Sequence, residues 1–169
     1  MRTIGVALAI PEPGGQLIAE ARARAGDPLA RSIPTHITLL PPTNVAGLDL
    51  VQFAGHLAQV ARSMQPFRVV LAGTATFRPV SSVVFVTVEE GVPELIKLQA
   101  AIRQGPVQRP LDFPYHPHVT LAHDVGDDAL DEVAAEFEDY RQSFVAGGFD
   151  LYEQDEGGSW ESVRPFPLG

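Results

Sequence analysis

The sequence predicts a single α+β domain made of two halves that follow the same plan. Its 169 residues match the length of one domain, which is typically about 150 residues. The order of predicted strands and helices in the first half recurs in the second. Each half also contains one His-x-Thr-Leu tetrapeptide at the same place.

Short apolar or alternating runs that end at proline or glycine predict the strands. The first run, Thr3–Ile10, ends at Pro11 and is far shorter than the about 20 residues that a membrane-spanning helix needs. We therefore interpret it as a buried strand rather than as a membrane or signal segment. The other predicted strands are Thr35–Leu40, Phe67–Phe77, Ser82–Val88, His118–Ala122, Ser143–Tyr152 and Ser159–Pro167, the last two forming a hairpin across Glu153–Gly158.

Four segments with apolar residues at helical spacing predict the helices. They are Leu17–Ala25, Leu50–Met64, Leu95–Ile102 and Leu130–Phe137. Gly26 and Gly105 follow the first and third segments as expected stops, and Pro93 suits the first turn of the third. Asp127 and its acidic neighbours suit the N-terminal end of the fourth, where the helix dipole favours negative charge.

The two halves place their tetrapeptides alike. Residues 3–77 read strand, helix, HITLL strand, helix, strand, and residues 82–152 repeat that order around HVTLA. The first strand begins 33 residues before His36, and its counterpart begins 36 residues before His118. We interpret the match as an ancient duplication. The alternative is chance likeness between two ordinary α+β segments.

Composition and charge exclude several classes of protein. Residues of the AVILMFWYC set make up 45% of the chain, which excludes disorder. The net charge of −9 disfavours non-specific binding to nucleic acid or to an anionic membrane, so a phosphate group is expected in a local pocket. The lack of cysteine excludes disulfides, thiolate metal sites and a cysteine nucleophile, and it fits a cytoplasmic protein, which we expect to be monomeric.

The tetrapeptides place two polar side chains on one face of a strand. Because side chains alternate, His36 and Thr38 point to one side while Ile37 points to the core. His118 and Thr120 repeat this arrangement. A single such motif is usually a half-buried structural histidine, whereas two in matched contexts favour a shared site.

Two imidazoles and two hydroxyls in one cleft suit in-line displacement at phosphorus. One imidazole deprotonates the attacking oxygen and the other protonates the leaving oxygen, each step contributing about 10²–10⁴-fold. The hydroxyls of Thr38 and Thr120 can donate hydrogen bonds to the non-bridging oxygens. This chemistry needs no metal, and we expect no cofactor.

The stretches IPTHITLLPP (Ile33–Pro42) and YHPHVTLAH (Tyr115–His123) resemble the 2H phosphoesterase superfamily, in its 2′-5′ RNA ligase-like and RNA 2′,3′-cyclic phosphodiesterase branch. The opening RTIGVALAIPEP and the ending SWESVRPFPLG add to the likeness, which covers nearly the whole chain. Two departures bear on substrate choice. The family often has arginine where His123 stands, and an aromatic residue where Leu40 stands.

The resemblance implies a bilobal fold over residues 1–169, with lobes at about 1–80 and 81–169 that can exchange strands. Each lobe would carry an antiparallel sheet with helices outside, and a central groove would lie between them. It also implies that His36, Thr38, His118 and Thr120 are catalytic, with His36 as the acid and His118 as the base, although the pseudo-symmetry lets these roles swap. The substrate would be a ribose 2′,3′-cyclic phosphate at an RNA end or on a small nucleotide.

Four other residues are predicted to contact substrate. Tyr115 precedes the second motif, where an aromatic ring can stack on a base. Phe77 and Arg78 end a strand, and Arg78 is either a phosphate ligand or a solvent-exposed side chain. His123 ends the second motif. Three aromatic residues are given structural places instead: Phe113 against the core, Trp160 in the core or bridging the lobes, and His56 on the surface.

Three alternatives remain open on the sequence alone. The chain could be a nucleotide-binding module that has lost turnover, or it could form 2′-5′ linkages. A zinc hydrolase built on His116 and His118 is the third, although Pro117 lies between them and a third ligand must come from elsewhere.

Overall fold

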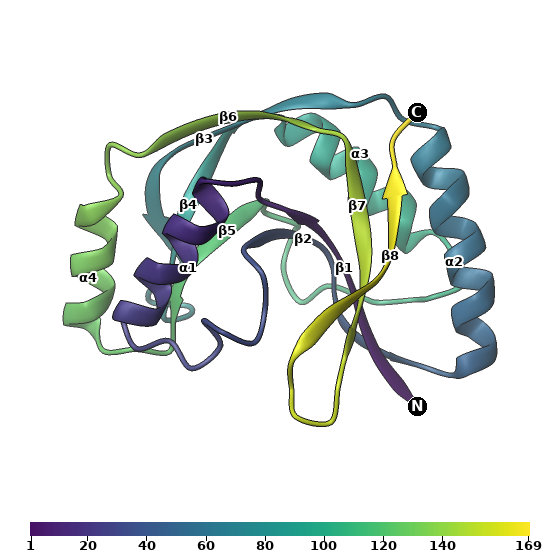
Figure 1. The fold of residues 1–169 in the computed structure, drawn as a ribbon, viewed down its shortest axis with the longest axis horizontal. Helices are drawn as coiled ribbons and strands as arrows, with labels where there is room; N and C mark the ends of the chain where they lie inside the picture. The colour runs from purple at the N-terminus through teal and green to yellow at the C-terminus, as the bar shows by residue number, and fades with distance from the viewer.

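Eight strands form one antiparallel sheet in the computed structural model, which describes all residues 1–169 (Figure 1). The strands are β1 (Arg2–Ala9), β2 (His36–Val45), β3 (Phe67–Thr76), β4 (Val83–Glu90), β5 (His118–His123), β6 (Arg141–Ala146), β7 (Gly148–Gln154) and β8 (Trp160–Pro167). Their order in the sheet is β6-β3-β4-β5-β2-β1-β7-β8. The two motif strands, β2 and β5, are therefore neighbours at its centre.

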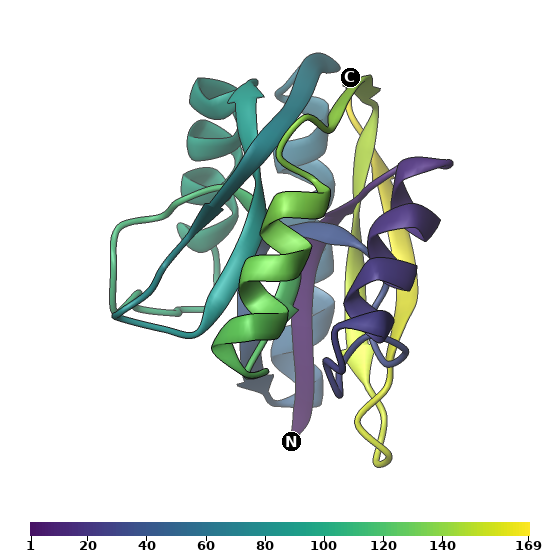
Figure 2. The same cartoon turned by 90° about the vertical axis from the view of Figure 1, so that its left-hand side faces the viewer.

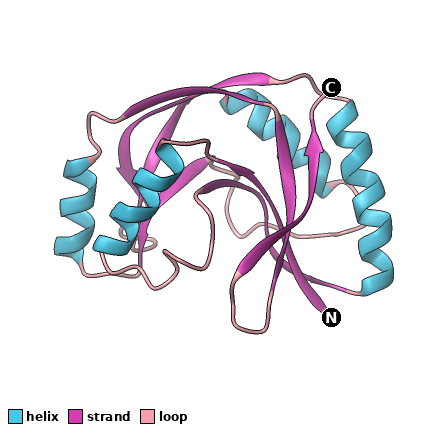
Figure 3. Cartoon of the chain, in the orientation of Figure 1, coloured by secondary structure: helices cyan, strands magenta, loops and turns pink.

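Four helices form two pairs, one on each side of the molecule (Figures 1 and 3). They are α1 (Gly14–Arg24), α2 (Gly47–Arg62), α3 (Val92–Arg103) and α4 (Asp127–Glu136). Helices α1 and α4 contact β5, while α3 contacts β2 and α2 contacts β8. Figure 2, which faces the first pair, shows α1 and α4 side by side in front of the strands. All four helices are too short or too polar to cross a lipid bilayer.

The repeated order of elements is confirmed. The chain runs β1-α1-β2-α2-β3 and then β4-α3-β5-α4-β6, followed by the hairpin of β7 and β8. The two halves of the sheet nevertheless differ from the two halves of the sequence. Strand β3 pairs with β4 and β6, and β7 returns to pair with β1.

The seam between the motif strands has local two-fold symmetry. The one register pair joining β2 to β5 is Ile37 with Val119, the middle residues of the two H-x-T motifs. Because equivalent residues face each other, a local two-fold axis passes between them. Irregularities in pairing also occur at matching places, between Val6 and Ala7 in β1 and between Val84 and Phe85 in β4. These shared details favour duplication over chance likeness.

Two predicted strand boundaries are wrong. Strand β2 does not stop before Pro41 but continues to Val45. Its two prolines lie at the irregularity opposite Gly5, where no ladder hydrogen bond needs their missing N–H groups. The predicted strand Ser143–Tyr152 is two strands that separate at Gly147, because β6 joins one edge of the sheet and β7 the other half.

The apolar face of the motif strands is buried as predicted. Ile37, Leu39, Val119 and Leu121 are at most 1% exposed and belong to a core cluster of 36 residues. Two predictions for aromatic side chains are wrong. Phe113 is 68% exposed instead of packing on the core. His56 is half-buried rather than on the surface, because its Nε2–H donates to the Ala101 carbonyl, 2.8 Å away on α3.

Candidate active site

The structure brings the four motif side chains onto one face of adjacent strands. His36, Thr38, His118 and Thr120 are half-buried on the side opposite the core residues Ile37 and Val119. The antiparallel register at the seam sets each histidine beside the threonine of the other motif. The predicted alternation of polar and core side chains is thus confirmed on both strands.

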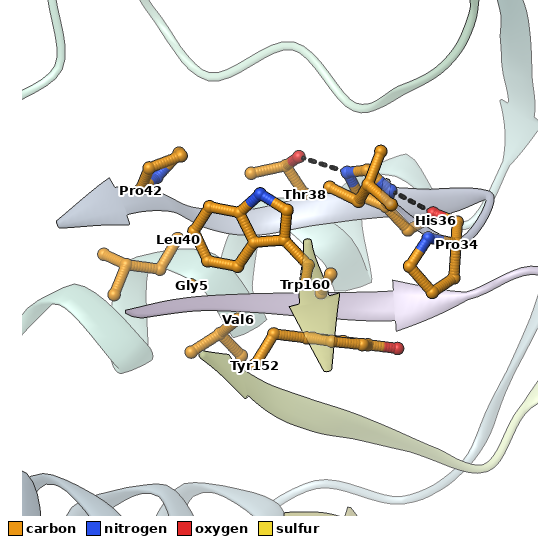
Figure 4. Close-up of a pocket in the computed structure, with 11 residues that line it drawn as sticks. Gly5, Val6, Pro34, His36, Thr38, Leu40, Pro42, Tyr152 and Trp160 are labelled. Carbon is orange, nitrogen blue, oxygen red and sulfur yellow. Dashed lines mark hydrogen bonds between the residues drawn. The ribbon is translucent and has the colours of Figure 1, made fainter. Parts of the chain in front are cut away.

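Each histidine is held by the backbone two residues before it. His36 Nδ1 lies 2.6 Å from the Pro34 carbonyl oxygen, and His118 Nδ1 lies 2.7 Å from the His116 carbonyl oxygen. A carbonyl only accepts, so both Nδ1 atoms carry the proton and both Nε2 atoms have a free lone pair in the neutral ring. Thr38 Oγ1 donates to His36 Nε2 across 3.1 Å (Figure 4). The two imidazoles therefore present the nitrogen that can take or give a proton.

Burial favours the neutral form of both imidazoles. It lowers the pKa of His36 from 6.5 to about 4, partly opposed by the hydrogen bond to Pro34 and assisted by the charges of Arg22 and His118. Burial also lowers the pKa of His118, and the contact with the His116 carbonyl opposes that shift. A neutral ring can act as the base without any further change. The acid requires a bound anion, whose charge raises the pKa of the ring beside it.

We expect His36 to make the fold sensitive to acid. Its pKa is lower in the folded chain, so the unfolded chain binds more protons between about pH 4 and 6.5, and stability falls as the pH drops through this window. The loss is at most about 3.5 kcal/mol, at about 1.4 kcal/mol per pKa unit. Urea unfolding at pH 4.5 and pH 7 should show a smaller acid loss for His36→Asn than for the unsubstituted chain. Equal losses would contradict the assignment.

Aromatic rings surround His118. The ring centroid of Phe77 lies 5.0 Å from that of His118 at 86°, and the Phe85 centroid lies 5.3 Å from it. Phe77 and Phe85 also contact each other at 4.4 Å, and both lie 5.4 Å from His116. Phe77 was predicted to contact substrate. The structure places it beside the site, as part of the wall that holds the His118 ring.

An open pocket lies beside His36 (Figure 4). Its lining comes from β1, β2, the segment before β2, and the C-terminal hairpin. The residues are Gly5, Val6, Ala7, Ile33, Pro34, His36, Thr38, Leu40, Pro42, Tyr152 and Trp160. Trp160 was predicted to lie in the core or to bridge the lobes. Its indole instead forms a wall of the pocket beside the first motif, and spacing along the chain gave no signal of this placement.

Tyr115 links the two motifs. Its hydroxyl donates to the Thr38 carbonyl oxygen at 2.7 Å, so the side chain reaches from the loop before β5 to β2. Burial raises the pKa of this phenol. The ring packs against the core and its hydroxyl is already bonded, so the structure gives Tyr115 a positioning contact where base stacking was predicted.

Arg78 and His123 face groups other than the motif side chains. Arg78 lies 3.3 Å from Asp127 and 2.8 Å from Asp131, two carboxylates of α4 that neutralise its charge. His123 donates its backbone N–H to Asp27, and its Nε2 lies 3.3 Å from Asp124. The pairing irregularity between Thr120 and Ala122 sets His123 opposite Val83, which has the same parity on β4 as Phe85 and Thr87, the partners of Thr120 and His118. The His123 side chain therefore lies on the face of the motif side chains, at the end of β5.

Arg22 is a cation near the site that the sequence did not single out. It lies on the buried face of α1, and its charge contributes to the lowered pKa of His36. Its Nε donates to Asp27 at 2.7 Å, and the two side chains are 9% and 0% exposed. An arginine among the apolar positions of a helix was the available signal.

The structure offers only two histidines, His116 and His118, for the zinc site that the sequence left open. The His116 and His118 rings are 6.3 Å apart, and the His118 Nδ1 is bonded to a backbone carbonyl. No group of three or more His, Cys, Asp or Glu side chains is placed to hold a metal ion.

A family model and two curated relatives match most of the chain. A model of the 2′-5′ RNA ligase superfamily matches residues 10–158. A Bacillus licheniformis protein that carries a provisional phosphoesterase name is 28% identical over 156 residues, covering 91% of this chain and 92% of its own. A Bacillus pumilus protein with a similar provisional name is 28% identical over 169 residues, covering 98% and 96%.

Solved structures share the fold at lower identity. Escherichia coli LigT complexed with 3′-AMP superposes with a TM-score of 0.78 at 19% identity, over 99% of this chain and 98% of that chain.

Proposed function

Because the chain belongs to the 2′-5′ RNA ligase superfamily, we propose that it is a metal-independent phosphoesterase that opens a ribose 2′,3′-cyclic phosphate. The observation that carries the proposal is the pairing of β2 with β5 at the centre of the sheet. That pairing puts two imidazoles, each with an Nε2 lone pair that can accept a proton, and two hydroxyls on one face. Histidine pairs of this kind can move both protons of an in-line displacement at phosphorus.

The chemistry follows from the atoms that the site presents. One imidazole Nε2 takes a proton from water, whose oxygen forms a bond to phosphorus. The bond from phosphorus to one ribose oxygen breaks, and that oxygen takes a proton from the second imidazole. The product is a ribose phosphomonoester, a 2′-phosphate when the 3′ oxygen leaves. Thr38 would turn its hydroxyl from His36 to donate to a non-bridging oxygen of the phosphate. Thr120 would donate to the other non-bridging oxygen.

Net charge favours a small substrate or the end of a chain. At −9, the protein gains little from contacts with a long phosphate backbone. Arg78, the cation at the end of β3, is already neutralised by two carboxylates. A nucleoside cyclic phosphate or a short RNA end therefore fits better than the interior of a long RNA.

The test is turnover of adenosine 2′,3′-cyclic phosphate by the purified protein in EDTA. We expect hydrolysis with a bell-shaped pH–rate profile and a single phosphomonoester product, identified by chromatography against 2′-AMP and 3′-AMP. Activity that disappears in EDTA and returns with Zn²⁺ would support the zinc alternative. Nucleotide binding by calorimetry without any turnover would support a binding module.

A second activity is favoured by the family itself. A 5′-hydroxyl can replace water as the attacking group, since the same base would deprotonate it, and the product would then be a 2′-5′ linkage. Incubation of an RNA end bearing the cyclic phosphate with a 5′-hydroxyl oligonucleotide separates the two reactions by product length.

A further inference from the structure

The local two-fold symmetry breaks at one pair of side chains. Ala7 on β1 pairs with Thr38, and Phe85 on β4 pairs with Thr120, so the two residues occupy equivalent places beside the motifs. The pairing irregularity lies immediately before each of them. On the second half, a phenyl ring occupies the floor beside the motif. On the first half, a methyl group leaves that space open.

The open space is the pocket beside His36. Phe85 and Phe77 pack against His118 on their side, whereas Ala7 and Gly5 form a low floor on the other side. The pocket walls are the Trp160 indole, Pro34 and Tyr152, and the polar side chains His36 and Thr38 stand at its edge (Figure 4). An apolar slot next to the phosphate chemistry suits a flat heterocycle rather than a second phosphate.

Trp160 is held in place from two sides. Its backbone N–H donates to the Ser32 carbonyl oxygen at 2.8 Å, and it pairs with Gln154 at the start of the hairpin. The indole lies so close over β1 that a Cβ added at Gly5 would be 3.5 Å from it. A tryptophan fixed before the ligand arrives binds a base without first losing side-chain freedom.

We propose that this pocket is a nucleobase subsite in which the base of the substrate stacks on the Trp160 indole. The inference rests on the proposed function and adds the place and orientation of the nucleoside. Stacking is possible for every base, so the subsite accepts purine and pyrimidine nucleotides alike.

The subsite also fixes the direction of the reaction. Either ribose oxygen that leaves phosphorus remains attached to the nucleoside, and in-line attack comes from the opposite side. A nucleoside seated beside His36 therefore makes His36 the acid and His118 the base, in agreement with the roles that the family resemblance implies.

The fluorescence of Trp160 reports on the subsite directly, because it is the only tryptophan in the chain. Titration with 2′-AMP should quench it saturably, while inorganic phosphate and ribose 5-phosphate should leave it unchanged. This measurement does not depend on turnover. Equal responses to all three ligands, or none to 2′-AMP, would overturn the subsite.

Two substitutions test the same pocket by filling or emptying it. Ala7→Phe copies the ring of the opposite half, and Trp160→Ala removes the stacking surface. Each should weaken 2′-AMP binding in calorimetry by about 5- to 150-fold, the range for loss of one stacked base. Val145→Phe adds the same ring at a side chain that is 67% exposed on β6 and should not change binding.

Substrates with and without a base separate this inference from the proposed function. Ala7→Phe should lower kcat/KM for adenosine 2′,3′-cyclic phosphate but not for methyl riboside 2,3-cyclic phosphate. If the unsubstituted chain hydrolyses both substrates and Ala7→Phe changes kcat/KM equally for both, the subsite is overturned while the proposed hydrolysis stands. Quenching by 2′-AMP without turnover would support the subsite and overturn the hydrolysis.

Discussion

Replacing His36 or His118 with alanine is expected to lower kcat on a ribose 2′,3′-cyclic phosphate by about 10²- to 10⁴-fold, because each imidazole performs one of the two proton transfers. The double variant should fall less than the product of the two single losses, since the two groups act in one transition state. Initial rates at saturating substrate, measured across pH, give these values.

A loss of turnover is informative only if the His36→Ala and His118→Ala variants are folded. Both rings are half-buried on the open face of the sheet, away from the core contacts of Ile37 and Val119, so circular dichroism spectra should match that of the unsubstituted chain. His56→Gln is the matched control, because His56 lies where α2 meets α3 and contacts Ala101 rather than the site. Near-normal turnover by either motif variant on every cyclic phosphate tried would refute the two-histidine mechanism.

The sequence predicted the parts of the fold that depend on local pattern. Alternation in H-x-T-L places Ile37 and Val119 in the core because side chains on a strand alternate, whatever the strand pairs with. The helix stops behave in the same way: Gly26, just after α1, has φ of 89°, a conformation that glycine adopts without strain. Such features need no knowledge of distant partners.

The incorrect or missed features depend on contacts between distant residues. The residue pattern of Ser143–Tyr152 cannot show that one part joins β3 and the other β1. Trp160 reaches the site only because β8 pairs with β7 and its N–H bonds to Ser32. Phe113 lies in the loop between α3 and β5, and its exposure reflects where that loop runs.

A second large effect is expected outside the candidate active site, at Asp27. Its fully buried carboxylate accepts hydrogen bonds from the Arg22 side chain and from the backbone N–H groups of Leu29 and His123. It thereby ties the end of α1 to the end of β5 and fixes the start of the segment that leads into the first motif. An uncompensated buried charge is far more destabilising than the intact pair is stabilising.

Asp27→Asn should therefore lower the free energy of unfolding by about 3–5 kcal/mol, because Arg22 remains buried with no anion. Adding Arg22→Met should restore part of that loss, because it removes the buried charge. If the loss came only from weakened hydrogen bonds to the backbone, Arg22→Met would restore nothing.

Arg24 and Glu136 form the matched exposed pair, with side chains 58% and 46% exposed, so Glu136→Gln should change stability by less than about 1 kcal/mol. Urea unfolding at pH 7 measures all three. If Asp27→Asn is no more destabilising than Glu136→Gln, or if Arg22→Met lowers its stability further, then charge burial does not govern this contact.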